Sequence, residues 1–190
     1  MIIYNENMSK QFQISNFKFQ IFVVLLITIG ISARLLPHPA NFSPVAALAI
    51  FGALYLPRKW TLVLPVSIMF LSDIIIGFYA WQIMASVYAC FILTSGLALW
   101  AKKYKTFSTI LGTTVLGSII FFLVTNAAVW GFGTMYTHNF SGLLQSYYMA
   151  LPFFRNSLLG DLFYTGIFVG IAEGIRYLYI KQATYEPNKT

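Results

Sequence analysis

Nine side chains of this sequence combine a residue type and a position that suit ligand binding within an otherwise apolar chain. They are Arg34, Asn41, Asp73, Asn126, Trp130, Phe154, Arg155, Asn156 and Asp161. Most of them fall inside or at the end of an apolar run, where a charged or amide group costs free energy and is therefore a functional candidate. The arginines suit a carboxylate, and the aromatic rings suit stacking on a flat ligand.

No pattern for catalysis or metal binding accompanies these nine residues. The sequence contains no GxSxG or HExxH motif, and its single cysteine and two histidines have no zinc-binding spacing. We therefore expect a protein that is not an enzyme and holds no cofactor or metal. A catalytic role would require Asp73 or Asp161 to lie within hydrogen-bond reach of a hydroxyl or a histidine in a pocket.

The composition indicates a membrane protein. Of the 190 residues, 58% are hydrophobic and 9% are charged, whereas a soluble domain carries roughly 25% charged residues. The excess of 12 Lys and Arg over 5 Asp and Glu is typical of cytoplasmic loops in membrane proteins. We therefore expect lipid around a single domain and no nucleic-acid partner.

Six apolar runs predict an all-α bundle of six transmembrane helices, at 19–36, 43–57, 60–78, 81–101, 107–130 and 156–180. The second run is short for a crossing of about 20 residues, so a half-helix or re-entrant segment is the alternative. Residues 1–18 and 181–190 are predicted to be cytoplasmic tails of a transmembrane domain at 19–180. Residues 131–155 are predicted to form an outer loop, in which an amphipathic stretch at 143–151 lies along the membrane surface.

With both termini inside, the cations gather on one side of the membrane. The predicted inner segments hold ten of the 12 Lys and Arg residues, namely Lys10, Lys18, Arg58, Lys59, Lys102, Lys103, Lys105, Arg176, Lys181 and Lys189. Only Arg34 and Arg155 remain outside. This asymmetry follows the positive-inside rule and predicts an N-in, C-in topology.

The same topology predicts that the charged and amide members of the nine residues lie in one layer near the outer face. Two interpretations of this layer remain open. The side chains line a polar pocket that opens outward, or Arg34–Asp73 and Arg155–Asp161 pair to hold helices together. Asn156 has a further alternative role as the N-cap of the last helix. Near the inner face, Glu173 and Arg176 are predicted to form an ion pair.

Four strings of the sequence resemble an uncharacterised family of small bacterial membrane proteins that is similar to the substrate-binding (S) components of energy-coupling factor transporters. The strings are Ala33–Pro44, Leu71–Asp73, Thr125–Trp130 and Leu151–Asp161, and the resemblance covers about residues 30–175. It implies an S-component-like bundle in the bacterial cytoplasmic (inner) membrane. It also implies capture of a micronutrient-type solute, with a membrane coupling protein and ATPase subunits as partners.

The first helix departs from S components because it lacks the AxxxA docking motif, and Ala49 and Ala53 form such a pair on the second helix instead. A non-catalytic assembly or structural protein is therefore the alternative function. The ion pairs would suffice for that role, together with a small-residue stripe at Gly166, Gly170 and Gly174. An intramembrane enzyme is the third hypothesis.

Overall fold

The computed structural model describes residues 16–185, and within them the chain forms helices and no strand. The helices are α2 (Asn16–Leu35), α3 (Val45–Tyr55), α4 (Arg58–Ile76), α5 (Trp81–Ala101), α6 (Phe107–Phe132) and α7 (Phe140–Tyr185). The prediction of an all-helical protein is therefore confirmed. Residues 1–15 and 186–190, which make up most of the two predicted tails, lie outside the described residues.

Four of these helices, α4, α5, α6 and α7, are long and apolar enough to cross a membrane. Many large apolar side chains lie on the molecular surface, among them Leu36 at 62%, Ile75 at 64% and Phe107 at 82% exposed. Water would disfavour so much exposed apolar area, whereas lipid tails accept it. The chain is therefore a membrane protein.

Local sequence signals set several of the helix ends. α4 ends at Gly77, whose φ of 107° is a conformation that side chains with a Cβ rarely adopt. α6 begins after Thr106, whose Oγ1 accepts a hydrogen bond from the N–H of Thr109 at 3.2 Å. The N-cap of α7 is Asn139, whose Oδ1 accepts a hydrogen bond from the N–H of Gly142 at 2.8 Å.

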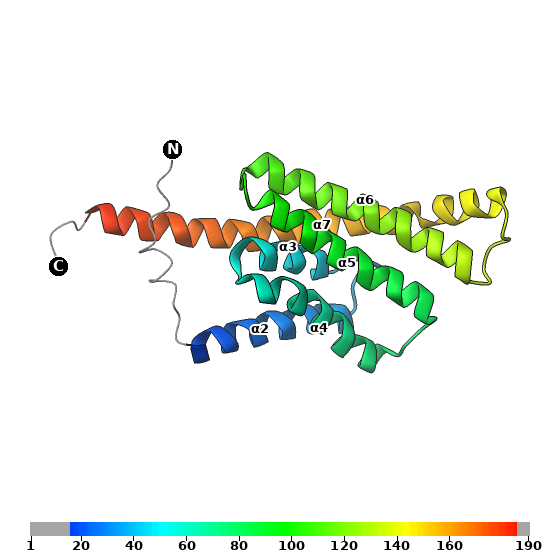
Figure 1. The fold of residues 1–190 in the computed structure, drawn as a ribbon, viewed down its shortest axis with the longest axis horizontal. Coiled ribbons are helices and arrows are strands. Elements are labelled where there is room, and N and C mark those ends of the chain that lie inside the picture. Colours follow the sequence, from blue (N-terminus) through cyan, green and yellow to red (C-terminus); the bar gives the residue numbers. More distant parts are fainter. Residues whose placement is uncertain (1–15, 186–190) are drawn as a thin grey trace.

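Successive helices run in alternating directions, so that the α3–α4 and α5–α6 turns and the C-terminal part of α7 lie toward one end (Figure 1). Two contacts join these segments: Lys102 Nζ donates to the Ala53 carbonyl at 3.1 Å, and Lys105 pairs with Glu173 at 2.8 Å. We call this the cation-rich end. It holds Arg58, Lys59, Lys102, Lys103, Lys105, Arg176 and Lys181.

Helix α3 is the centre of the bundle and packs against α4, α5, α6 and α7. Its buried residues are Val45, Ala47, Leu48, Ala49, Ile50, Phe51, Gly52, Ala53 and Leu54. With 11 residues, it is about 16 Å long, roughly half the thickness of the hydrocarbon core. The predicted crossing at 43–57 is thus a short buried helix, preceded by a non-helical segment at 36–44.

The predicted outer loop at 131–155 is wrong in most of its length. Only residues 133–139 are non-helical, and the amphipathic stretch at 143–151 belongs to α7, which contains 46 residues. The last apolar run was predicted to begin at residue 156, whereas α7 begins at Phe140 and contains Pro152. A proline is tolerated there because one lost backbone hydrogen bond does not end a helix that neighbouring side chains hold in place. The ring of Phe122 on α6 packs on Tyr147 and Phe154 of α7, on either side of this proline.

The segment 36–44 packs tightly against α7 at Gly160. A Cβ added to Gly160 would lie 3.2 Å from the Cα of Phe42, closer than ordinary van der Waals contact. We expect Gly160→Val to destabilise the protein by roughly 1–3 kcal/mol through overpacking, measured as a lower Tm of the purified protein in detergent.

Gly166→Val is the matched control, because the same helix carries this glycine and nothing lies within 4 Å of its added Cβ. The change in helix propensity is the same for both variants. Equal melting temperatures for the two variants would contradict the close packing of α7 on Phe42.

Candidate functional site

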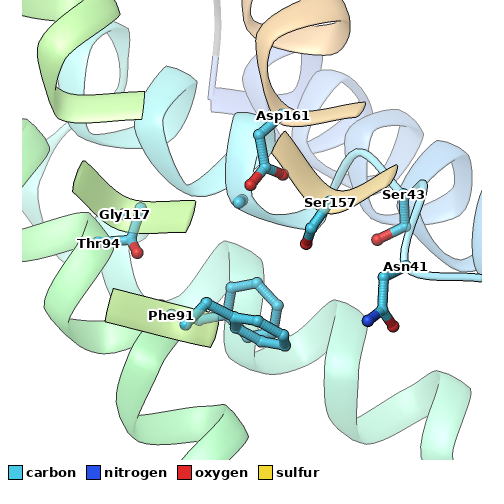
Figure 2. Close-up of a pocket in the computed structure, with 9 residues that line it drawn as sticks. Asn41, Ser43, Phe91, Thr94, Gly117, Ser157 and Asp161 are labelled. Atoms are coloured by element: carbon cyan, nitrogen blue, oxygen red, sulfur yellow. The ribbon is translucent and has the colours of Figure 1, made fainter. Parts of the chain in front are cut away.

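A cavity of about 50 Å³ lies between α5, α6, α7 and the beginning of α3 (Figure 2). Its lining residues are Asn41, Ser43, Ala46, Phe91, Thr94, Gly117, Phe121, Ser157 and Asp161. Asn41 is exposed, whereas Asp161 is only 6% exposed, so the cavity extends from the surface to a buried carboxylate. A void of about 10–15 Å³ suffices for one water molecule, and this cavity therefore has room for a small polar solute.

Backbone features of two residues shape the cavity. Asn41 has a φ of 64°, which asparagine tolerates better than most residues, and this turn leads the chain back toward α3. On the opposite wall, Gly117 lets α6 approach α5, because an added Cβ would lie 3.1 Å from Thr94 Oγ1. The cavity is thus bounded by tightly packed helices and opens beside Asn41.

Asp161 is a buried carboxylate without a cationic partner. Its Oδ2 accepts a hydrogen bond from Ser118 Oγ at 2.7 Å. Within residues 19–182, no Lys, Arg or His side chain lies within 4.0 Å of it. An ionisable group in the apolar part of a membrane protein is costly, so its position at a cavity marks a candidate binding site.

The contact between Asp161 and Ser118 brings a carboxylate within hydrogen-bond reach of a hydroxyl group, but that hydroxyl group lies outside the cavity. Ser118 is 1% exposed and does not line the cavity. Its Oγ also lies 3.0 Å from the Thr114 carbonyl, so two acceptors share its single proton. The pair therefore orients the carboxylate of Asp161 and presents no nucleophile to the cavity.

The first turn of α3 forms a second polar side of the cavity. Pro44 occupies the N-cap position and makes no side-chain cap, and the neighbouring residues Ser43 and Ala46 line the cavity. The first N–H groups of any helix have no partner within the helix. This end of α3 therefore offers hydrogen-bond donors close to the cavity.

Arg34 and Asp73 form a separate buried cluster that joins α2, α4 and α5. Arg34 Nη2 lies 2.9 Å from Asp73 Oδ1, Arg34 Nη1 donates to Ser72 Oγ at 2.6 Å, and Tyr88 donates to Asp73 Oδ2 at 2.9 Å. Asp73 is 1% exposed, and neither charged residue lines the cavity. The predicted Arg34–Asp73 pair is confirmed, and its satisfied geometry is that of a structural contact.

Three further predicted residues lie on α6 and α7 with local partners. Asn126 Nδ2 donates to the Phe122 carbonyl at 2.8 Å, Trp130 Nε1 donates to the Thr137 carbonyl at 3.0 Å, and the Phe154 ring packs on Phe122 at 4.8 Å between centroids. None of the three lines the cavity. Asn126 thus bonds within its own helix, Trp130 joins the end of α6 to the loop at 133–139, and the Phe154 ring packs α7 against α6.

The predicted pair of Arg155 with Asp161 is not formed. Arg155 is exposed and makes no ion pair within the described part of the chain. Asn156 lies inside α7 and donates to the Ala40 carbonyl at 3.1 Å, so it does not cap the helix as one alternative suggested. Of the nine predicted residues, the structure brings Asn41 and Asp161 to the cavity and pairs Arg34 with Asp73 elsewhere.

The prediction of a single polar layer is wrong at Asp161. This residue contacts Ser118 of α6, and Asn126 lies about 12 Å further along the same helix, at 1.5 Å per residue. A helix beginning at residue 156 would put Asp161 in its second turn, but α7 begins at Phe140. Asp161 is therefore deeper in the bundle than expected.

Sequence reasoning missed the small hydroxyl residues of the cavity, Ser43, Thr94 and Ser157, and the partner Ser118. Isolated serines and threonines are common in apolar helices, where they hydrogen-bond to a carbonyl of the preceding turn. One signal was present: Ser157 and Asp161 are four residues apart and so share one face of a helix.

The cation-rich end contains a second polar cluster around Glu173. Its carboxylate pairs with Arg176 at 3.2 Å and with Lys105 at 2.8 Å, and Tyr55 donates to it at 2.7 Å. The predicted Glu173–Arg176 pair is thus confirmed. Burial and the nearby Lys105 lower the pKa of Lys102 from its usual value. Within residues 16–185 no group of His, Cys, Asp and Glu side chains is arranged to hold a metal ion.

Comparison with known families gives one finding. Residues 14–183 match a family described as "Family of unknown function (DUF6580)". No curated protein and no solved structure matches the chain.

The buried Arg34–Asp73 pair is expected to contribute more to the free energy of unfolding than the more exposed Lys105–Glu173 pair. Asp73→Ala leaves Arg34 and Tyr88 without their buried partner and should destabilise the protein by about 3 kcal/mol or more. Lys105→Met breaks a more exposed pair and should cost less than about 1 kcal/mol. Thermal unfolding in detergent measures both. A smaller loss for Asp73→Ala than for Lys105→Met would contradict a structural role for the Arg34 cluster.

Proposed function

We propose that this chain, which belongs to the Family of unknown function (DUF6580), binds a small polar solute in the cavity at Asp161 as the solute-binding subunit of a membrane transport system. The observation that carries the proposal is a buried carboxylate that faces a cavity and has no cationic partner among the side chains of residues 19–182. Its one hydrogen bond, from Ser118, leaves part of the carboxylate unsatisfied, and a solute with hydrogen-bond donors would satisfy it.

The proposed topology has six membrane crossings with both termini in the cytoplasm. It is supported by the gathering of cations at one end of the bundle, which the positive-inside rule assigns to the cytoplasm. Asn41 precedes the end of α3 that points away from this cation-rich end. A solute would then enter from outside. The short α3 completes its crossing through the non-helical segment at 36–44.

The proposed partners follow from the resemblance to S components. In that arrangement the chain lies in the bacterial cytoplasmic membrane and captures a micronutrient-type solute, while a membrane coupling protein and ATPase subunits supply the energy. Docking would use the cation-rich end, because coupling subunits and ATPases act on the cytoplasmic side. The chain itself is proposed to bind and release the solute without chemical change.

A non-catalytic assembly protein is the second candidate, and one observation favours it. Gly166, Gly170 and Gly174 lie along α7, and nothing lies within 4 Å of an added Cβ at any of them. Such a stripe lets another helix approach closely. Solute binding requires a cavity that is accessible from outside, whereas an assembly role does not.

Cysteine labelling tests the direction from which the cavity opens. The native Cys90 is buried and is replaced by alanine, and single cysteines are introduced in place of Asn41, Ser157 or Lys103. A membrane-impermeant maleimide added to intact cells should label Asn41→Cys rapidly and Ser157→Cys more slowly. Lys103→Cys should react only after permeabilisation.

Ser146→Cys on α7 is the control for burial, because Ser146 is 1% exposed and lies outside the cavity. Labelling of Ser157→Cys no faster than that of Ser146→Cys would argue against an open cavity and favour the assembly role. Labelling of Lys103→Cys in intact cells would reverse the proposed topology.

Native mass spectrometry of the purified protein tests solute capture. The wild-type protein is expected to retain a small molecule that Asp161→Asn loses, because the neutral amide cannot attract a positively charged or strongly donating group. Tyr88→Phe is the matched control, since it removes a hydrogen bond to the other buried carboxylate, Asp73. A solute retained equally by Asp161→Asn, or no solute on any form, would contradict the proposed site.

A further inference from the structure

The cavity has two polar sides of opposite character, one that accepts hydrogen bonds and one that donates them. The carboxylate of Asp161 and the hydroxyl group of Ser43 both line it (Figure 2). Ala46, in the first turn of α3, lines the same cavity. A ligand that satisfies both sides must carry a hydrogen-bond donor and a hydrogen-bond acceptor.

The beginning of α3 requires an acceptor that the described chain does not provide. Within residues 16–185, the N–H groups of Val45, Ala46 and Ala47 donate no hydrogen bond, and the first N–H with a partner is that of Leu48, bonded to the Pro44 carbonyl at 2.8 Å. Val45 is 1% exposed and Ala47 is 0% exposed. Buried backbone N–H groups are nearly always hydrogen-bonded, so an acceptor belongs at this helix end.

Asp161 requires the opposite, a cation or a strong donor. Three basic side chains with polar contacts in the bundle are occupied elsewhere: Arg34 pairs with Asp73, Lys102 donates to the Ala53 carbonyl, and Lys105 pairs with Glu173. The single hydrogen bond from Ser118 leaves one oxygen of the carboxylate without a partner in the described residues. The cavity is the remaining space that this oxygen faces.

We propose that the cavity binds a small zwitterion of the amino-acid type, with its ammonium group on Asp161 and its carboxylate on the first-turn N–H groups of α3. This inference rests on the proposed function. A helix N-terminus carries roughly half a positive charge, so a simple cation at Asp161 would be repelled by α3, and a simple anion at α3 would be repelled by Asp161. A neutral zwitterion aligned with both ends meets neither repulsion.

The charge and size of the cavity narrow the ligand class further. One carboxylate balances one positive charge, which favours an ammonium group over a divalent metal ion. Thr94 and Ser157 supply hydroxyl groups at the same cavity, and Phe91 and Phe121 close one side of it with apolar rings. A volume of about 50 Å³ favours a compact ligand such as glycine or β-alanine, and any larger substituent would extend toward Asn41.

Binding of four defined probes to the full-length purified protein in detergent tests this inference. The probes are glycine, β-alanine, methylammonium chloride, which carries only the amine, and sodium acetate, which carries only the carboxylate. At matched ionic strength, glycine or β-alanine should bind saturably and at least about tenfold more tightly than methylammonium or acetate, measured by the shift in Tm with probe concentration. Methylammonium binding as tightly as both zwitterions would overturn the proposal in favour of a cation site, and acetate doing so would indicate an anion site.

Asp161→Asn should weaken zwitterion binding at least about tenfold, while Tyr88→Phe should leave it unchanged. Unchanged binding by Asp161→Asn would also overturn the proposal, because the carboxylate would then be a neutral structural group. The comparison among probes uses the wild-type protein and does not depend on the folding of any variant.

The outcomes separate this inference from the proposed function. If Ser157→Cys is labelled from outside and a solute co-purifies, but no zwitterion binds, solute capture stands and the ligand class is wrong. If the cavity is not accessible and no solute co-purifies, the proposed function itself fails.

Discussion

The length of α3 is the constraint from which the candidate site follows. A helix of 11 residues covers about 16 Å, whereas the hydrocarbon core is about 30 Å thick. In the proposed topology the non-helical segment at 36–44 covers the remaining distance, and polar backbone groups at membrane depth then need partners from the protein. α7 packs against this segment where Gly160 meets Phe42, and Asn156 donates a hydrogen bond to the Ala40 carbonyl. The cavity lies where this segment meets the end of α3.

The two buried aspartates illustrate different solutions to the same physical problem. Asp73 is compensated by Arg34 and Tyr88, so the cost of burying its charge is offset within the protein. Asp161 receives one hydrogen bond from Ser118 and faces a cavity instead. The partners of Asp73 favour a fixed contact among three helices. The carboxylate of Asp161, by contrast, is only partly compensated by the protein, and a ligand in the cavity would supply the rest. The difference lies in the partners, because both carboxylates are almost fully buried.

Much of the architecture was predictable because long apolar runs are strong signals, and the runs at 81–101 and 107–130 match α5 and α6 closely. The Arg34–Asp73 pair was also predictable, because an unpaired charge in an apolar run costs free energy and pairing with an opposite charge lowers that cost. The start of α7 was not predictable from local rules, because Pro152 looks like a boundary while the contacts of Phe122 with Tyr147 and Phe154 hold the helix across it. Because the last helix was predicted to begin at residue 156, Asp161 was predicted to lie closer to the outer face than it does. The hydroxyl groups around it are recognisable only once the helices are assembled.

The continuous α7 also has a mechanical consequence. Its 46 residues extend about 69 Å, more than twice the thickness of the hydrocarbon core. The carboxylate of Asp161 is attached to the same rod as Glu173 and Lys181, so the wall of the cavity and the cytoplasm-facing surface of the proposed topology are parts of one element. A tilt or a shift of this rod that widens the cavity must also displace its end in water. Binding of a solute in the cavity would therefore be coupled to the position of the C-terminal part of α7, which lies tens of ångströms away along the same helix.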